Sequence, residues 1–181
     1  MKKTIIIIGT IFLLIILYFL LFGLEIGNVT IGKQPAVKTR QEIQIKNSLF
    51  YNQYYSKNKL TVLNLWATWC QPCIEEMPDL NAIKKKYIAQ DINFISMSVD
   101  NDSLRLAKFI EKGRFEFKDI TFENLQYTNA IINRLEDRSL DTHISSKSVP
   151  ITYLIRNERV LKKFYGTVDG DELVDAIEKF K

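Results

Sequence analysis

The chain has 181 residues, with 25 lysines and arginines against 21 aspartates and glutamates and a formal charge of +4. This length fits one domain with a short appendage. The nearly even charge, without a basic run interleaved with aromatic residues, argues against nucleic-acid binding. Two cysteines are too few for a disulfide scaffold, so stability must come from burial of a core.

Residues 5–24 form an uncharged run rich in Ile, Leu and Phe. About 20 apolar residues match the hydrocarbon thickness of a bilayer, whereas a cleaved signal peptide has a shorter apolar stretch and a small-residue cleavage site. We therefore predict that residues 1–24 are an uncleaved membrane anchor, with a transmembrane helix that contacts the lipid bilayer through residues 5–24. Lys2 and Lys3 precede the span and Glu25 follows it, which favours a cytoplasmic N-terminus and an extracytoplasmic domain.

The rest of the chain divides into a tether and a domain. Residues 25–41 contain Gly, Asn, Pro and Lys without a hydrophobic period, which indicates a tether, and residues 42–181 form the domain. The first expected elements are an edge strand over 42–46, a helix from Asn47 or Ser48 to about 58, strand 60–67, helix 72–89 and strand 92–99. A helix with Leu104, Ala107 and Ile110 on one face follows and stops at Gly113. The remaining elements are strand 117–122, helix 125–136, strands 151–156 and 159–165 and a last helix from about Asp169. This order predicts an α/β fold with a central mixed sheet flanked by helices.

Cys70 and Cys73 lie between a predicted buried strand and a predicted helix. Free amides and the dipole of a first helical turn stabilise an anion, so a thiol with an ordinary pKa of about 8.5 ionises more readily there. A two-residue spacer brings both sulfurs within bonding distance. We expect Cys70 to be the attacking thiolate and the less exposed Cys73 to resolve the mixed disulfide. Trp66 and Trp69 are expected to pack around the pair, with Trp69 partly exposed.

Half of a zinc site and an inert cysteine pair are the alternative interpretations. Structural zinc needs four nitrogen or sulfur ligands, and this chain offers two cysteines and one histidine, His143. A strand followed by C-x-x-C and a helix is the setting that is typical of redox chemistry. We therefore predict a redox pair with no metal and no cofactor.

The segment Trp66-Ala67-Thr68-Trp69-Cys70-Gln71-Pro72-Cys73 resembles the active-site strand of the TlpA-like and ResA-like thioredoxin-fold proteins. Glu76-Met77-Pro78 and Val149-Pro150-Ile151-Thr152 add to this resemblance, which covers roughly residues 60–180. It implies a thioredoxin-like domain that is tethered outside the cytoplasmic membrane and reduces disulfides, often on apocytochromes during haem attachment. The stretch from 101 to 149 is longer than a thioredoxin needs and is predicted to be an insertion before the proline.

The resemblance also implies roles for single residues. Cys70 and Cys73 match the redox-active disulfide, and Glu76 matches a buried acid with a raised pKa that moves the proton of Cys73. A solvated charge on the helix surface is the alternative for Glu76. Pro150 matches a cis-proline that faces the cysteines, and the Val149 backbone before it is expected to pair with a substrate strand.

The leading hypothesis is an extracytoplasmic thiol–disulfide oxidoreductase, whose partners are protein disulfides and a membrane or extracytoplasmic redox partner, with cytochrome c maturation as one setting. The residues leave its redox direction open, and the resemblance favours a reductant. The alternatives are a Cu(I)-handling protein that adds Met77, Met97 or His143 to the two thiolates, and a tethered non-catalytic adaptor. Peroxidase chemistry is disfavoured, because Ala67 stands where a peroxidatic site usually has threonine.

Overall fold

The computed structural model describes residues 13, 18, 24–26, 29–31, 45–138 and 148–181. The chain divides into two units, Met1–Glu42 and Ile43–Lys181. In the first unit, β1 (Leu24–Ile26) and β2 (Val29–Ile31) form an antiparallel pair that begins at the last residue of the predicted anchor and otherwise lies in the predicted tether. No helix among the described residues has the length and apolar character needed to cross a bilayer, and the predicted span lies outside the described residues except at positions 13, 18 and 24.

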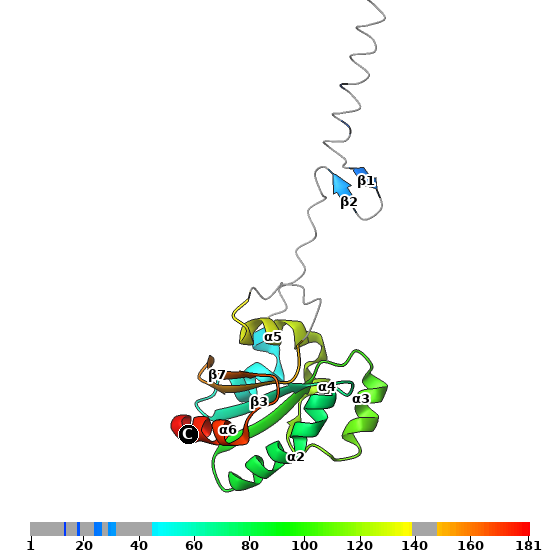
Figure 1. Ribbon diagram of the computed structural model, residues 1–181. Helices are drawn as coiled ribbons and strands as arrows, with labels where there is room; N and C mark the ends of the chain where they lie inside the picture. The colour runs from blue at the N-terminus through cyan, green and yellow to red at the C-terminus, as the bar shows by residue number, and fades with distance from the viewer. Residues whose placement is uncertain (1–12, 14–17, 19–23, 27–28, 32–44, 139–147) are drawn as a thin grey trace, which may run out of the picture. The chain divides into compact units, whose positions relative to one another are not determined.

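The second unit is built on a five-stranded mixed sheet in the order β5-β4-β3-β6-β7 (Figure 1). The strands are β3 (Leu60–Trp66), β4 (Ile92–Ser98), β5 (Lys118–Asp119), β6 (Ile151–Arg156) and β7 (Arg159–Tyr165). β3 runs parallel to β4 and antiparallel to β6. The predicted mixed sheet is confirmed, and the last two strands have the predicted bounds across a turn in which Asn157 and Glu158 both have positive φ.

Helices cover both faces of this sheet. α2 (Gln71–Lys86) and α6 (Gly170–Phe180) lie on one face, and α5 (Thr128–Leu135) lies on the other (Figure 1). Successive side chains of a strand point to opposite faces, so Val62 packs in a cluster with α2 and α6, whereas Leu63 packs in a second cluster with α5. Every residue of β3 is buried, which explains its nearly continuous apolar sequence.

The segment before β3 differs from the prediction. Of the expected strand 42–46, residues 42–44 lie outside the described residues, and Ile45–Asn47 forms a 3-10 turn instead, η1. Ser48 closes this turn, because its hydroxyl donates to Ile45 O at 2.6 Å and accepts from Tyr51 N at 3.0 Å. The helix that follows ends with a π-helical turn, η2 (Tyr51–Tyr55), so the prediction that it reaches residue 58 was wrong.

The expected strand over 117–122 is reduced to the two residues of β5. Asp119 accepts a hydrogen bond from Thr121 N at 2.9 Å, which turns the chain out of the sheet and into α4 (Thr121–Asn124). The expected helix 125–136 is therefore divided into a 3-10 turn, η3 (Leu125–Tyr127), and α5. Residues 139–147 of the predicted insertion lie outside the described residues.

The apolar face predicted for the helix after β4 was wrong at Leu104, whereas Ala107 and Ile110 are partly buried and Ile110 packs against the core. α3 (Ser103–Ile110) is capped by Asp102, whose carboxylate accepts hydrogen bonds from the amides of residues 104 and 105. Leu104 is 75% exposed, and the buried leucine is Leu106. The reason is that the Phe109 ring packs on the Trp66 ring, with 5.0 Å between the centroids, and this contact sets the rotation of the helix.

Candidate active site

The two cysteines lie where the central strand meets a helix. Cys70 follows β3 as the N-cap of α2, and its Sγ accepts a hydrogen bond from Cys73 N at 3.3 Å. The two sulfurs form a disulfide. Both cysteines are buried, with Cys70 5% and Cys73 1% exposed, so the order in which they attack stays a prediction. Helix amides directed at Cys70 Sγ would stabilise a thiolate there after reduction.

A carboxylate on the neighbouring strand fixes the loop before Cys70. Asp100 follows β4, and its side chain accepts from Thr68 N at 2.8 Å and from Thr68 Oγ1 at 2.6 Å. Ser98 Oγ donates to the same carboxylate at 2.6 Å. Trp69, next in the loop, is 54% exposed, as predicted. Sequence reasoning missed Asp100, although a polar residue just beyond the carboxyl end of a parallel strand is a usual place for a site residue.

Glu76 is a buried carboxylate, only 5% exposed, which excludes the solvated-charge interpretation. Its oxygens accept hydrogen bonds from Asn64 Nδ2 at 2.9 Å and from Val168 N at 3.1 Å. Asn64 Nδ2 also donates to Thr152 Oγ1 at 3.0 Å. Burial raises the pKa of Glu76, and the hydrogen bonds from Val168 and Asn64 only partly offset this effect.

This polar network joins four parts of the fold: β3, α2, β6 and the loop before α6. Glu76 follows Cys73 by three residues, so the two side chains lie on one face of α2. Sequence reasoning did not identify Asn64 or Thr152 as members. The signal was an asparagine within a strand buried on both faces, because a buried polar group needs a hydrogen-bond partner.

The start of β6 lies at the same end of the sheet as the cysteines. The register pairs Ile151 with Leu65, one residue before the end of β3. The Val149–Pro150 peptide bond is cis, as the resemblance implied. Pro150 is buried and its carbonyl accepts from Gly166 N at 3.0 Å, while Val149 is partly exposed. Val149 packs against the large core cluster to which both cysteines also belong.

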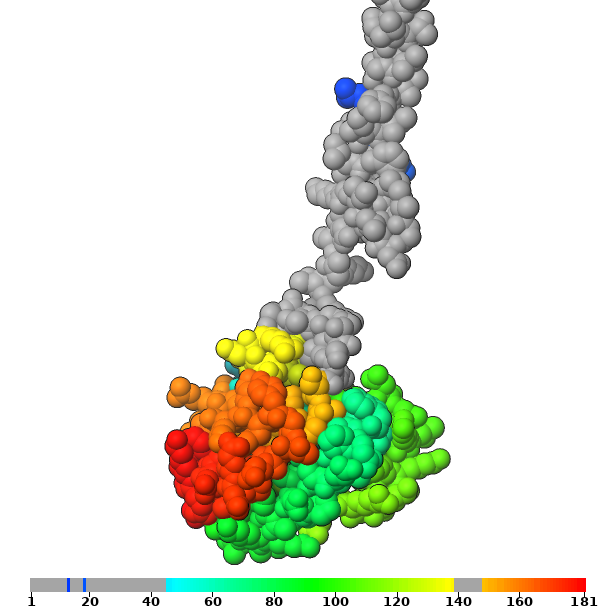
Figure 2. All heavy atoms as spheres, viewed as in Figure 1, coloured from blue at the N-terminus to red at the C-terminus, as the bar shows by residue number. Residues whose placement is uncertain are grey.

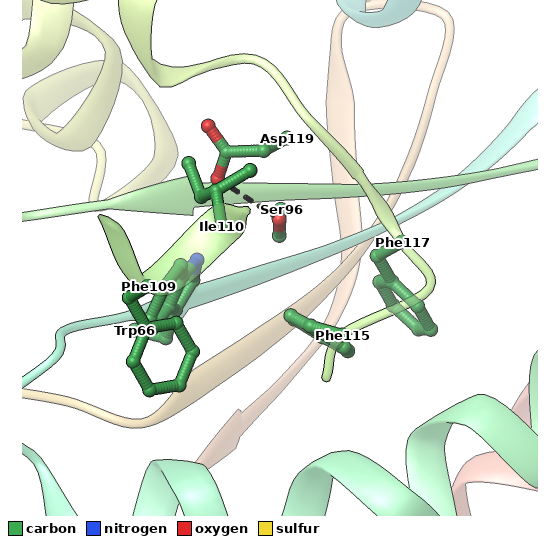
Figure 3. A pocket seen from close by; sticks show the side chains of 7 residues that line it. All are labelled: Trp66, Ser96, Phe109, Ile110, Phe115, Phe117 and Asp119. Carbon is green, nitrogen blue, oxygen red and sulfur yellow. Dashed lines mark hydrogen bonds between the residues drawn. The ribbon is translucent and has the colours of Figure 1, made fainter. Parts of the chain in front are cut away.

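A small cavity of about 70 Å³ lies behind the active-site strand, between the sheet and α3 (Figure 3). Aromatic rings of Trp66, Phe109 and Phe115 form much of its wall, and Asp119 accepts a hydrogen bond from Ser96 Oγ at 3.1 Å within it. Burial raises the pKa of Asp119, although hydrogen bonds from Thr121 and Ser96 oppose the shift. The volume suits one or two water molecules rather than a substrate.

Comparison with known proteins places the chain in a family. Residues 34–178 match the Redoxin family. The chain belongs to this family. The thiol-disulfide oxidoreductase ResA of Geobacillus thermodenitrificans is 29% identical over 126 residues, which are 69% of this chain and 65% of that relative, so the match spans slightly less than two thirds of the relative's length.

Solved structures agree with the fold of this Redoxin-family chain. StoA from Bacillus subtilis superposes with a TM-score of 0.51 at 15% identity, over 66% of this chain and 82% of StoA. The thiol:disulfide interchange protein DsbE from Chlorobium tepidum gives a TM-score of 0.50 at 25% identity, over 69% of this chain and 79% of DsbE. The thioredoxin-like α/β fold and the ResA-like resemblance are therefore confirmed.

Two of the three residues proposed as additional Cu(I) ligands, both methionines, lie among the described residues of this Redoxin-family domain. Met77 and Met97 are both buried in the core, and His143 lies outside the described residues. In the part of the chain that the structure describes, no three histidine, cysteine, aspartate or glutamate side chains are grouped as metal ligands.

Replacing Glu76 by glutamine should shift the pH dependence of cysteine alkylation. An ionised Glu76 disfavours a second negative charge on the sulfurs one helical turn away, so the midpoint of alkylation in the reduced variant should move to lower pH, by about half a unit to one unit. The measurement is the alkylation rate of the reduced protein between pH 5 and 10. Identical midpoints in the wild-type and Glu76→Gln proteins would remove Glu76 from the proton transfer.

Proposed function

We propose that this protein is a thiol–disulfide oxidoreductase that reduces protein disulfides through Cys70 and Cys73. The observation that carries the proposal is the disulfide at the start of α2, with Cys70 Sγ at the helix amides and Cys73 behind it. Membership of the Redoxin family and the likeness to ResA support it.

The proposed reaction starts from the dithiol form. The Cys70 thiolate attacks one sulfur of a substrate disulfide, the substrate S–S bond breaks, and one substrate thiolate leaves. Glu76 assists loss of the proton from Cys73, whose thiolate then attacks Cys70 Sγ. This step releases the second substrate thiolate and forms the Cys70–Cys73 disulfide. Two electrons have passed to the substrate, and a dithiol redox partner restores the starting form.

The substrate chain needs a place to lie during these steps. The backbone of Val149 is the proposed contact, because it is partly exposed at the sheet end that carries the cysteines. Its amide and carbonyl have no hydrogen-bond partner among the described residues. An extended segment of the substrate could therefore pair with this backbone while its disulfide faces Cys70.

The test is a redox titration of the full-length protein in detergent. After equilibration with glutathione buffers of graded potential, two thiols per chain should appear together in one two-electron transition, and the reduced protein should then reduce a protein disulfide. The Cys70→Ala variant should show neither behaviour. A cysteine pair that stays oxidised at every potential, or a dithiol that never reduces a disulfide, would refute the proposed function.

We further propose that residues 5–24 anchor the protein in the cytoplasmic membrane and that the domain acts on the extracytoplasmic side, with cytochrome c maturation as its setting. The support is the uncharged apolar run after Lys2 and Lys3, together with the family resemblance. Protease added to intact cells without an outer barrier should digest the domain. Full protection of the domain in such cells, with digestion only after lysis, would contradict this location.

A further inference from the structure

We propose that the groove between the active-site loop and α3 binds an acidic segment of the disulfide-containing polypeptide. This inference rests on the proposed function and adds the chemistry by which a substrate is recognised. It draws on a surface that the redox reaction itself does not use.

The groove reaches the loop that precedes Cys70. Its volume is about 690 Å³, and Thr68, two residues before Cys70, forms part of its wall. The opposite wall is α3 and the turn after it, with Leu104 and Lys108 among its residues. Figure 2 shows the blue-green surface near residue 70 next to the yellow-green surface of α3. Asp100 holds Thr68 in place, so this side of the groove is fixed relative to Cys70.

The charged side chains of this groove are mostly positive. Arg105 and Lys108 lie three residues apart on one side of α3, and Lys112 lines the groove from the turn after the helix. None of them forms an ion pair with an acid among residues 45–138 and 148–181. Asp102 also lines the groove and caps α3 through two amides, so the groove carries three cations against one carboxylate.

Such a row of like charges repels itself unless an anion lies against it. Leu104, 75% exposed, adds an apolar contact on the same groove. A polypeptide with glutamates or aspartates and an apolar residue near its cysteines satisfies both features. An anionic membrane surface fits less well, because the surface is concave and includes Thr68 of the loop that leads to Cys70.

The contact would act before the chemistry. Complementary charges increase the rate of encounter and hold the substrate in one orientation, while uncharged disulfides gain nothing from them. The groove should therefore distinguish substrates by the charge near their disulfide and leave the intrinsic reactivity of Cys70 unchanged.

The experiment compares three disulfides with the reduced full-length protein in a non-ionic detergent: a peptide disulfide flanked by four glutamates, the same peptide with glutamines, and bis(2-hydroxyethyl) disulfide. At low ionic strength we expect the glutamate peptide to react about tenfold faster than the glutamine peptide. The Arg105→Glu/Lys108→Glu variant should lose this preference and should reduce the small disulfide at the wild-type rate.

The matched control removes two other exposed cations. Lys57 and Arg159 lie at the opposite end of the sheet from Cys70, because Lys57 precedes β3 and Arg159 begins β7. The Lys57→Glu/Arg159→Glu variant changes the net charge by the same amount and should keep the tenfold preference. Loss of the preference in this control would overturn the proposal, because it would show an effect of net charge alone.

Binding is measured separately from chemistry with a fluorescent glutamate peptide whose cysteines are replaced by serine. Tighter binding to the wild-type protein than to the Arg105→Glu/Lys108→Glu variant supports the groove even if the redox reaction fails. Equal binding to both proteins, while the small disulfide is still reduced, overturns the groove and leaves the proposed function intact. If anionic phospholipid in reconstituted vesicles blocks the peptide through Arg105 and Lys108, the surface belongs to the membrane and the proposal is wrong.

Discussion

The Cys73→Ala variant is expected to become a covalent trap that holds its substrate through Cys70. Cys73 lies next to Cys70 Sγ, so its thiolate acts as an intramolecular nucleophile with a very high effective concentration. Without it, release of the mixed disulfide should slow by at least about 10³-fold, because only external thiols remain to attack it. Non-reducing electrophoresis of the variant from cells should show adducts that disappear with dithiothreitol.

The reciprocal variant is the control for this trap. Cys70→Ala retains Cys73, which is only 1% exposed and therefore poorly placed to attack a polypeptide disulfide. It should form few adducts or none. Equal adduct formation by both variants would mean that the order of attack proposed for the two cysteines is wrong.

The Asn64→Ala substitution should destabilise the domain by about 2–4 kcal/mol at neutral pH. Asn64 is 1% exposed and donates to both Glu76 and Thr152, so its removal leaves two buried oxygens with one partner fewer each. A buried polar group that loses its partner costs about 1–3 kcal/mol, and more when it is charged. Urea unfolding of both proteins at several pH values measures the difference.

This destabilisation should grow as the pH rises. The pKa of Glu76 is raised on folding, so the wild-type domain loses stability as the pH rises from the unfolded-state pKa of this carboxyl through its folded-state pKa. The hydrogen bond from Asn64 limits that loss, and the Asn64→Ala protein should lose more over the same interval. In a Glu76→Gln background the cost should be independent of pH. A cost that is the same at pH 5 and pH 8 in the wild-type background would contradict the role given to Asn64.

Local patterns predicted the parts of the fold that local interactions decide. The β6–β7 hairpin has the predicted bounds because strand propensity and the Asn157-Glu158 turn agree. The redox pair could also be predicted from the sequence, because its strand, its two cysteines and its helix occupy one short segment. Ser48 also closes the turn at which a helix start was predicted.

Contacts between segments that are far apart in the sequence determine the features that the sequence analysis missed. α3 has two overlapping apolar stripes, and the packing of Phe109 on Trp66 selects the one that includes Leu106 and exposes Leu104. Asn64 meets Thr152 only because the register of β3 and β6 pairs these two positions. Asp100 reaches Thr68 because β3 and β4 are neighbours in the sheet. The sequence alone does not give the order and register of the strands, so it does not reveal these contacts.

The two outer strands of the sheet have a consequence for a protein that handles the cysteines of other polypeptides. β5 offers only two residues for pairing with another chain. Along β7, Lys162 forms an ion pair with Glu172 on α6, and Lys163 forms one with Glu136, which follows α5. This strand is therefore held by ion pairs on both faces of the sheet. Short and lysine-bearing borders discourage strand addition and aggregation. A partly unfolded substrate can therefore pair with only two residues at β5, and along β7 it meets lysine side chains that are held in ion pairs.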